Sequence, residues 1–142
     1  MTIAIPVYGG FMEWSADGTA WATIKGAKTL IIPEVSQDYK ERTSLDSEDY
    51  FKEWGKGLKD GGELTLETYY TPANYDAAEV KEALAEPVQF RATLAPAVDQ
   101  AAGDTFVFKG FVTLAIMPED VNGDVMLNIK VRTTGGMTRT RG

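Results

Sequence analysis

The stretch Asp124–Thr133, DVMLNIKVRT, decides the fold class. Every second residue in it is a branched apolar one: Val125, Leu127, Ile129 and Val131. The positions between them carry mostly polar or charged side chains. Alternation with a period of two predicts a β-strand that buries one face and exposes the other to water.

The neighbouring sequence repeats this pattern. The segments VQFRATLA (88–95) and DTFVFKGFVTLAIM (104–117) also alternate, and residues 64–70 predict a further strand. Shorter strands are expected at 19–24 and 29–32. Asn122-Gly123 predicts a tight hairpin turn, and Gly110 predicts a bulge or bend within its long strand. Strands joined in this way predict an antiparallel β-sandwich or barrel.

One segment, YDAAEVKEALAEP, predicts a helix at about residues 76–86. Asp76 and Glu79 have the spacing of a capping box, and Pro87 ends the helical pattern. A narrow apolar stripe would pack on the sheets; it consists of Ala77, Val80, Ala83 and Leu84. The fold class is therefore mainly β, with one packed α-helix and a long loop at about 41–62.

Composition narrows the range of functions. The chain has 142 residues and a net charge of −7, which fits a single domain over residues 1–142, with a flexible tail at about 134–142. It has no cysteine and no histidine, the residues on which most catalytic and transition-metal sites rely. We therefore expect no enzyme activity, no cofactor and no metal site. An acidic chain also disfavours tight nucleic-acid binding.

The long loop has an unusual composition. Tyr50, Phe51 and Trp54 follow helical spacing, Leu58 lies four residues further on, and Ser47 is a candidate cap. These residues predict a short aromatic helix or turn at 47–54, followed by a glycine hinge at 55–62. Its large apolar side chains either fold back on their own domain or dock on another copy of the chain.

Two alternatives from other functional classes stay open. One is a carbohydrate-binding β-sandwich that uses Trp14, Trp21 and Trp54 as a platform. The other is an enzyme that uses paired carboxylates, with Asp46 and Glu48 as candidates.

Two stretches carry a resemblance to a known family. RTSLDSEDYFKEWGKGLKDGGELTLETYYTPANYD (42–76) and MPEDVNGDVMLNIKVRTTG (117–135) resemble regions of the tail tube, or major tail, proteins of long-tailed bacteriophages. Phage-like particles such as gene transfer agents use the same proteins, which are related to type VI secretion tube proteins. The resemblance covers roughly residues 20 to 135.

The resemblance implies a structural subunit without catalysis. Such subunits form hexameric rings that stack into a hollow conduit, which we expect to be acidic-lined, and DNA passes through it without sequence-specific binding. The implied partners are further copies of the chain and the tape measure, tail terminator and baseplate or distal tail proteins, with no membrane involved. The implied location is the tail of a virion or phage-like particle, assembled in the bacterial host cytoplasm.

The resemblance also implies roles for particular residues. The long loop would reach an adjacent subunit or ring, and its candidate contact residues are Leu45, Asp46, Ser47, Tyr50, Phe51, Trp54 and Leu58. In this set Asp46 and Ser47 would fix the turn. Glu63 and Glu67, on the polar face of their strand, are the candidates for lining the lumen.

Overall fold

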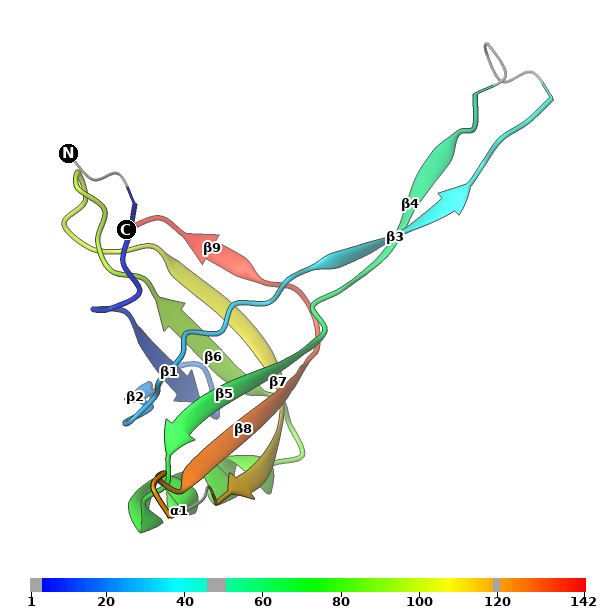
Figure 1. The fold of residues 1–142 in the computed structure, drawn as a ribbon. Helices are drawn as coiled ribbons and strands as arrows, with labels where there is room; N and C mark the ends of the chain where they lie inside the picture. Colours follow the sequence, from blue (N-terminus) through cyan, green and yellow to red (C-terminus); the bar gives the residue numbers. More distant parts are fainter. Residues whose placement is uncertain (1–3, 46–50, 119–120) are drawn as a thin grey trace.

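The computed structural model describes residues 4–45, 51–118 and 121–142. They form a β-barrel with one helix and a long two-stranded arm that projects from it (Figure 1). The elements are β1 (Phe11–Ser15), β2 (Ala22–Thr23), β3 (Ser36–Glu41), β4 (Trp54–Asp60), β5 (Glu63–Tyr69), α1 (Pro72–Glu82), β6 (Val88–Thr93), β7 (Thr105–Met117), β8 (Met126–Thr133) and β9 (Thr138–Thr140). The predicted mainly β class with antiparallel strands and one helix is confirmed.

The main sheet has seven strands in the order β2-β1-β6-β7-β8-β5, with β9 also paired to β7. A short segment joins its two edges. Ile24 N donates a hydrogen bond to Met12 O of β1 (2.9 Å), and Lys28 N donates one to Glu67 O of β5 (2.8 Å). Since one stretch of chain bonds to both edges, the sheet closes on itself as a barrel.

The barrel core confirms the predicted alternation from Leu127 onward. Leu127, Ile129 and Val131 of β8 are almost completely buried, whereas Lys130 and Arg132 are exposed. The prediction is wrong at the start of the stretch, where Val125 is 45% exposed and Met126 is buried. Facing strands contribute Met12, Trp14, Leu66, Val88, Phe90, Phe108 and Val112 to the same core. The rings of Phe90 and Phe108 stack with their centroids 5.5 Å apart.

The predicted bulge or bend at Gly110 is not seen in the pairing of β7. Gly110 pairs in register with Val88 of β6 and with Thr133 of β8. Glycine is needed at this position because the backbone of β8 lies very close: a Cβ atom at residue 110 would be 2.6 Å from Arg132 O. The strand beside β7 is interrupted instead. β8 ends at Thr133, and after Gly135, which has φ of 77°, the chain pairs with β7 again as β9.

The helix begins and ends four residues earlier than predicted. Thr71 is its N-cap, with Oγ1 accepting a hydrogen bond from Asn74 N (3.1 Å), and Pro72 occupies the first helical position. The buried residue is Ala78, while Val80 of the predicted apolar stripe is 62% exposed. None of the helices in the described ranges is long and apolar enough to cross a membrane.

The prediction of a long loop at about residues 41–62 is wrong for the second half of that segment. Residues 54–60 form β4, which pairs antiparallel with β3. Gly55 and Gly57 lie within this strand, so they are not a hinge; only Gly62 at its base has a positive φ, 74°. Strand pairing is favoured here because Gly55 leaves room for Arg42, whose guanidinium lies where a Cβ atom would be. We call residues 34–60 the arm.

Candidate assembly interface

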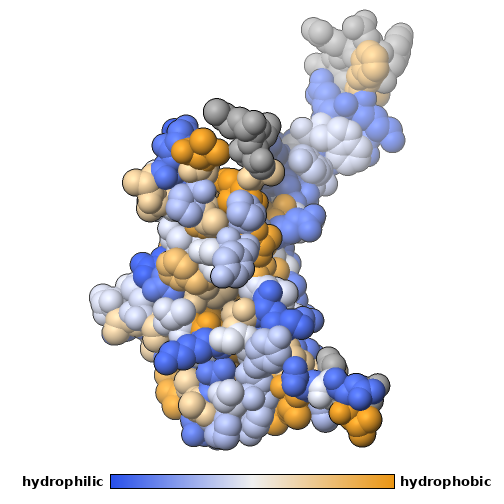
Figure 2. All heavy atoms as spheres, turned by 60° about the vertical axis from the view of Figure 1, so that its left-hand side comes forward, coloured by the Kyte–Doolittle hydropathy of each residue, from blue (hydrophilic) through white to orange (hydrophobic). Residues whose placement is uncertain are grey.

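The arm stands away from the barrel, both in the ribbon of Figure 1 and as a separate lobe in Figure 2. Its large apolar side chains are exposed to solvent: Tyr39 61%, Leu45 109%, Phe51 71%, Trp54 58% and Leu58 83%. A two-stranded hairpin alone is at best marginally stable in water. Exposed aromatics on such an element indicate a surface that becomes covered by a partner.

The register of β3 and β4 gives the arm two different faces. Tyr39 pairs with Lys56 and Glu41 with Trp54, so these side chains share one face, with a shallow hollow between Tyr39 and Trp54. A register shift between Gln37 and Tyr39 increases the twist of the hairpin. No sequence pattern predicts an element at residues 34–41, so Tyr39 is not among the predicted contact residues.

The base of the arm is fixed to the barrel. Asp60 accepts hydrogen bonds from Gly62 N (3.0 Å) and from Arg132 Nη2 of β8 (3.2 Å). The Gly62 hydrogen bond first, and then the charge of Arg132, lower the pKa of Asp60 below its ordinary value. Gly62 O in turn accepts the Thr133 hydroxyl hydrogen bond (2.6 Å). The direction in which the arm leaves the barrel is therefore set by side chains of β8.

Four of the seven predicted contact residues belong to the described part of the chain, and their role as contacts stays a prediction. Leu45, Phe51, Trp54 and Leu58 are exposed on the arm. Asp46, Ser47 and Tyr50 lie outside the described residues, and so does Glu48 of the alternative enzyme site. The predicted short helix begins among these undescribed residues; at Trp54 the chain has already entered β4.

The candidate lumen residues lie on the outer face of the sheet. Glu63 and Glu67 of β5 are exposed, and their neighbours on β8 are Arg132 and Asn128, respectively. Lys130, also exposed, is paired with Thr65 between them. This part of the sheet therefore carries charges of both signs.

The three tryptophans do not form a shared platform. Trp14 is 5% exposed in the core, whereas Trp54 is on the arm. Trp21 lies against the barrel under the guanidinium of Arg91, 4.4 Å from the ring centre, and Arg91 makes two 2.9 Å hydrogen bonds to Glu13. A carbohydrate platform built from these rings is therefore not supported by their positions.

The C-terminal strand is fixed by one carboxylate. Asp104 accepts hydrogen bonds from Arg139 Nη2 (2.6 Å), Gln100 Nε2 (2.8 Å) and Gly142 N (3.1 Å). These bonds, with that from Arg139 first, lower the pKa of Asp104 to about 2. Residues 138–140 of the predicted flexible tail thus form a strand, and the edge of β9 away from β7 has no strand neighbour among the described residues.

Metal chemistry has no candidate in the described part of the chain. Within residues 4–45, 51–118 and 121–142, no group of three or more acidic, histidine or cysteine side chains could hold an ion. The features that stand out here are therefore surfaces suited to protein contacts.

Comparison with known proteins gives results only at the level of structure. No protein-family profile and no curated protein sequence matches the chain. It is similar to a protein in the tail of an empty GTA (gene transfer agent) particle, solved with C6 symmetry: 14% identity, 92% of this chain and 94% of that chain covered, TM-score 0.65. It is also similar to a protein in the six-fold symmetrised baseplate of the anti-feeding prophage: 10% identity, 99% and 98% covered, TM-score 0.67.

These likenesses define a class of fold. The chain has the fold of subunits in the tails of phage-like particles, as the two sequence stretches at 42–76 and 117–135 suggested. Nearly the whole length of each compared chain is covered, so the arm and the barrel belong to one shared architecture.

Proposed function

We propose that the chain is a structural tail subunit that assembles into stacked hexameric rings and forms a hollow conduit for DNA. The arm carries this proposal: with Val35 (44%) it exposes six large apolar side chains on an element that does not pack on its own barrel. The six-fold symmetry of both structurally similar assemblies supports a hexameric ring.

In this proposal the arm is the main contact between subunits. Trp54, Leu58 and Tyr39 would be buried on a neighbouring copy, where aromatic residues commonly contribute most of the binding free energy. Leu45 and Phe51 would enlarge the same contact. Asp46, Ser47 and Tyr50 would fix the turn and extend the contact, as the resemblance implies.

The conduit itself would be lined by the outer sheet face, with Glu63 and Glu67 as its acidic candidates. Acidic groups repel the DNA backbone and keep it mobile. Arg132 and Lys130 lie beside them, so the two glutamates bring the net charge of these four residues to zero, and losing them would leave that face basic. The proposed tape measure, tail terminator and baseplate partners would meet the ends of such a tube in a virion or phage-like particle that assembles in the host cytoplasm.

The test compares two double variants on the same arm. Trp54→Ala with Leu58→Ala removes apolar contacts, and Lys40→Ala with Lys59→Ala removes exposed charges of the same hairpin. Negative-stain microscopy and sedimentation of concentrated protein measure assembly, and circular dichroism measures folding. We expect the wild type and the lysine variant to form rings or tubes, and the apolar variant to stay a folded monomer.

Two outcomes would contradict the proposal. If the wild type gives only isolated particles over the whole accessible concentration range, the chain is not a self-assembling tube subunit. If the variant with Trp54→Ala and Leu58→Ala forms tubes at normal yield, the chain is a tube subunit, but the arm is not the contact that holds the subunits together.

A further inference from the structure

The connection between β7 and β8 contains an asparagine followed directly by a glycine, Asn122-Gly123. β7 ends at Met117 and β8 begins at Met126, so the connection is longer than the tight hairpin turn predicted from this pair. Asn122 lies in a turn and Gly123 in a bend, both are exposed, and Val121 before them is 98% exposed. The pair is therefore open to water, at the same end of the barrel as α1 (Figure 1).

An exposed Asn-Gly pair can react with itself in water. The backbone nitrogen of Gly123 attacks Cγ of Asn122, a C–N bond forms and the Cγ–Nδ2 bond breaks, and the side-chain nitrogen leaves as ammonia with the proton of the Gly123 N–H. Water then opens the resulting cyclic imide at either carbonyl carbon and leaves aspartate or isoaspartate at position 122. Glycine favours the first step, because no Cβ atom crowds its nitrogen and its backbone reaches the required conformation easily.

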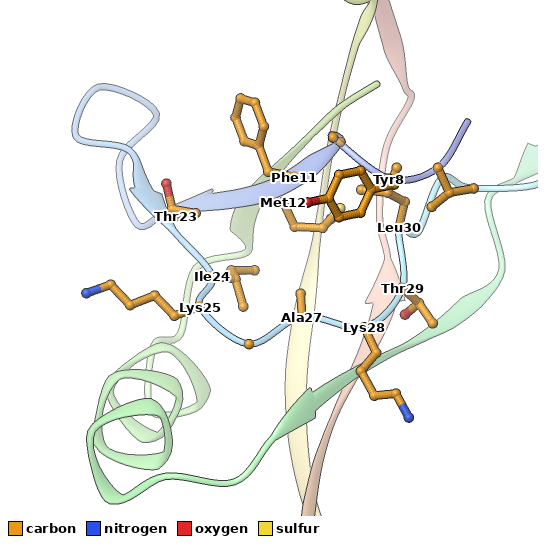
Figure 3. Close-up of a pocket in the computed structure, with 14 residues that line it drawn as sticks. Tyr8, Phe11, Met12, Thr23, Ile24, Lys25, Ala27, Lys28, Thr29 and Leu30 are labelled. Atoms are coloured by element: carbon orange, nitrogen blue, oxygen red, sulfur yellow. The ribbon is translucent and has the colours of Figure 1, made fainter. Parts of the chain in front are cut away.

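Asn74, another asparagine of the chain, is held by its side chain. It lies in α1, and its Nδ2 donates hydrogen bonds to Lys25 O (3.0 Å) and Tyr69 O (3.2 Å). The amide is thus tied to Lys25, which borders a groove of about 650 Å³ shown in Figure 3. Tyr75, the next residue, carries a Cβ atom and a ring beside the nitrogen that would have to attack.

Asn128, the third asparagine, is protected by strand pairing. It lies within β8 and pairs with Glu67 of β5 on one side and with Ala115 of β7 on the other. The next residue is the β-branched Ile129, which is 1% exposed. Ring closure at this position would need the backbone to leave both ladders, which requires local unfolding of the barrel.

Two Asp-Gly pairs, Asp17-Gly18 and Asp60-Gly61, could form the same ring, but their carboxyl groups are held ionised. An ionised carboxylate reacts poorly with a nitrogen nucleophile, because it carries no good leaving group. Asp17 Oδ1 accepts hydrogen bonds from Thr19 N (3.0 Å) and Ala20 N (3.1 Å), which lower the pKa of Asp17. The Gly62 hydrogen bond described above lowers the pKa of Asp60 in the same way.

We propose that Asn122 is a site of spontaneous modification, which converts to aspartate and isoaspartate in the folded chain. The reaction needs no second copy of the chain, so it does not depend on the proposed assembly. Either product adds one negative charge to a chain of net charge −7, close to Asp124, and isoaspartate also lengthens the main chain of the turn by one carbon atom. The β7–β8 pairing ends at Met117 and Met126, outside the turn, so the barrel stays folded.

The test follows all three asparagines in one sample. Folded protein is incubated at mildly alkaline pH, digested with trypsin and analysed by mass spectrometry with fragmentation. Lys109 and Lys130 bound one tryptic peptide that contains both Asn122 and Asn128, so the second asparagine is an internal control for the first. We expect Asn122 to convert faster than Asn74 and Asn128 by on the order of tenfold or more, because it needs no unfolding. Equal conversion at the three sites, or no conversion at Asn122, would overturn the proposal.

Repeating the incubation in urea separates the effect of the fold from that of the local sequence. Since the turn is already open, unfolding should change the rate at Asn122 by less than about threefold and should raise the rates at Asn74 and Asn128. A rate at Asn122 that rises about tenfold or more in urea would mean that the folded turn protects this residue, and the proposal would be wrong.

Two glycine variants test the attacking atom. Gly123→Ala adds a methyl group beside the nitrogen and should slow conversion at Asn122 by about tenfold. The matched control is Gly136→Ala, which adds its methyl group where no atom lies within 4 Å and should leave the rate unchanged. Circular dichroism shows whether each variant is folded, and Asn122→Gln, which carries its amide on a longer side chain, should gain no charge over the same period. Conversion at the wild-type rate in Gly123→Ala would show that water attacks the amide directly and would overturn the proposed reaction.

Discussion

Replacing Gly110 by alanine tests how tightly the centre of the barrel is packed. The added Cβ atom would lie 2.6 Å from Arg132 O and 2.6 Å from Val131 Cγ1, well inside normal contact. Neither neighbour can give way easily, because β7 is bonded at this point to β6 on one side and to β8 on the other. The strands must therefore move apart by several tenths of an ångström.

The size of the effect follows from two opposing contributions. Overpacking of this kind costs about 1–3 kcal/mol. Replacing glycine within a strand returns about 0.5–1 kcal/mol through lower chain entropy. From the middle of each range, the net loss is about 1.3 kcal/mol, which corresponds to a fall in Tm of roughly 4 °C for a domain of this size.

Two control variants separate crowding from backbone conformation. Gly136 has no atom within 4 Å of its Cβ position, so Gly136→Ala should change stability by less than about 0.5 kcal/mol. Gly62 is equally open but has φ of 74°, so Gly62→Ala should cost about 1 kcal/mol through backbone strain alone. Thermal unfolding followed by far-ultraviolet circular dichroism measures all three. A Gly110→Ala protein that melts within about 1 °C of the wild type would refute the reasoning.

Other variants test the core, the helix and the C-terminal strand. Phe90→Ala should cost about 3–5 kcal/mol in urea unfolding, because a fully buried ring stacked on Phe108 is lost. Thr71→Ala should cost about 1 kcal/mol and Thr71→Ser much less, since serine keeps the capping hydroxyl. Hydrogen bonds from Arg139, Gln100 and Gly142 lower the pKa of Asp104 to about 2. The ionised carboxylate therefore contributes its full stabilisation above the ordinary pKa of 3.8, and this contribution is lost as the pH falls toward 2. The Tm difference between wild type and Asp104→Asn should therefore be constant above about pH 5 and shrink as the pH falls toward 2; a difference that does not change with pH would contradict this role.

The barrel was predictable because its strands bury one face. Residues 127–131, 88–93 and 105–117 alternate for this reason, and all three lie in paired strands, whereas Val125 lies just before β8 and is 45% exposed. The helix was predicted four residues late because the Asp76 and Glu79 spacing was read as its start. The true start signal was Thr71 followed by Pro72, an N-cap and a first-turn proline.

The arm was not predictable in the same way. Neither face of β3 or β4 is buried in the single chain, so their sequences show no apolar alternation. Trp54 of the predicted short helix and Gly55 of the predicted hinge are neighbours in β4, where they pair with Glu41 and Lys40 of β3. Large apolar side chains with no core to join are visible from composition alone, and the candidate contact residues were chosen on that ground. Four of them, Leu45, Phe51, Trp54 and Leu58, are exposed on the arm, and their role as contacts stays a prediction.

The separation of the arm from the barrel also has a consequence for the life of an unassembled subunit. Lys40, Arg42, Lys52 and Lys56 are all exposed on the arm, on an element with little of its own to hold it closed. A trypsin-like protease should therefore cut a free subunit there first. The barrel would survive such a cut, since its strands on both sides of the arm stay paired. In the proposed assembly the arm is covered by a neighbouring copy, so the same protease should cut assembled protein more slowly than free subunits.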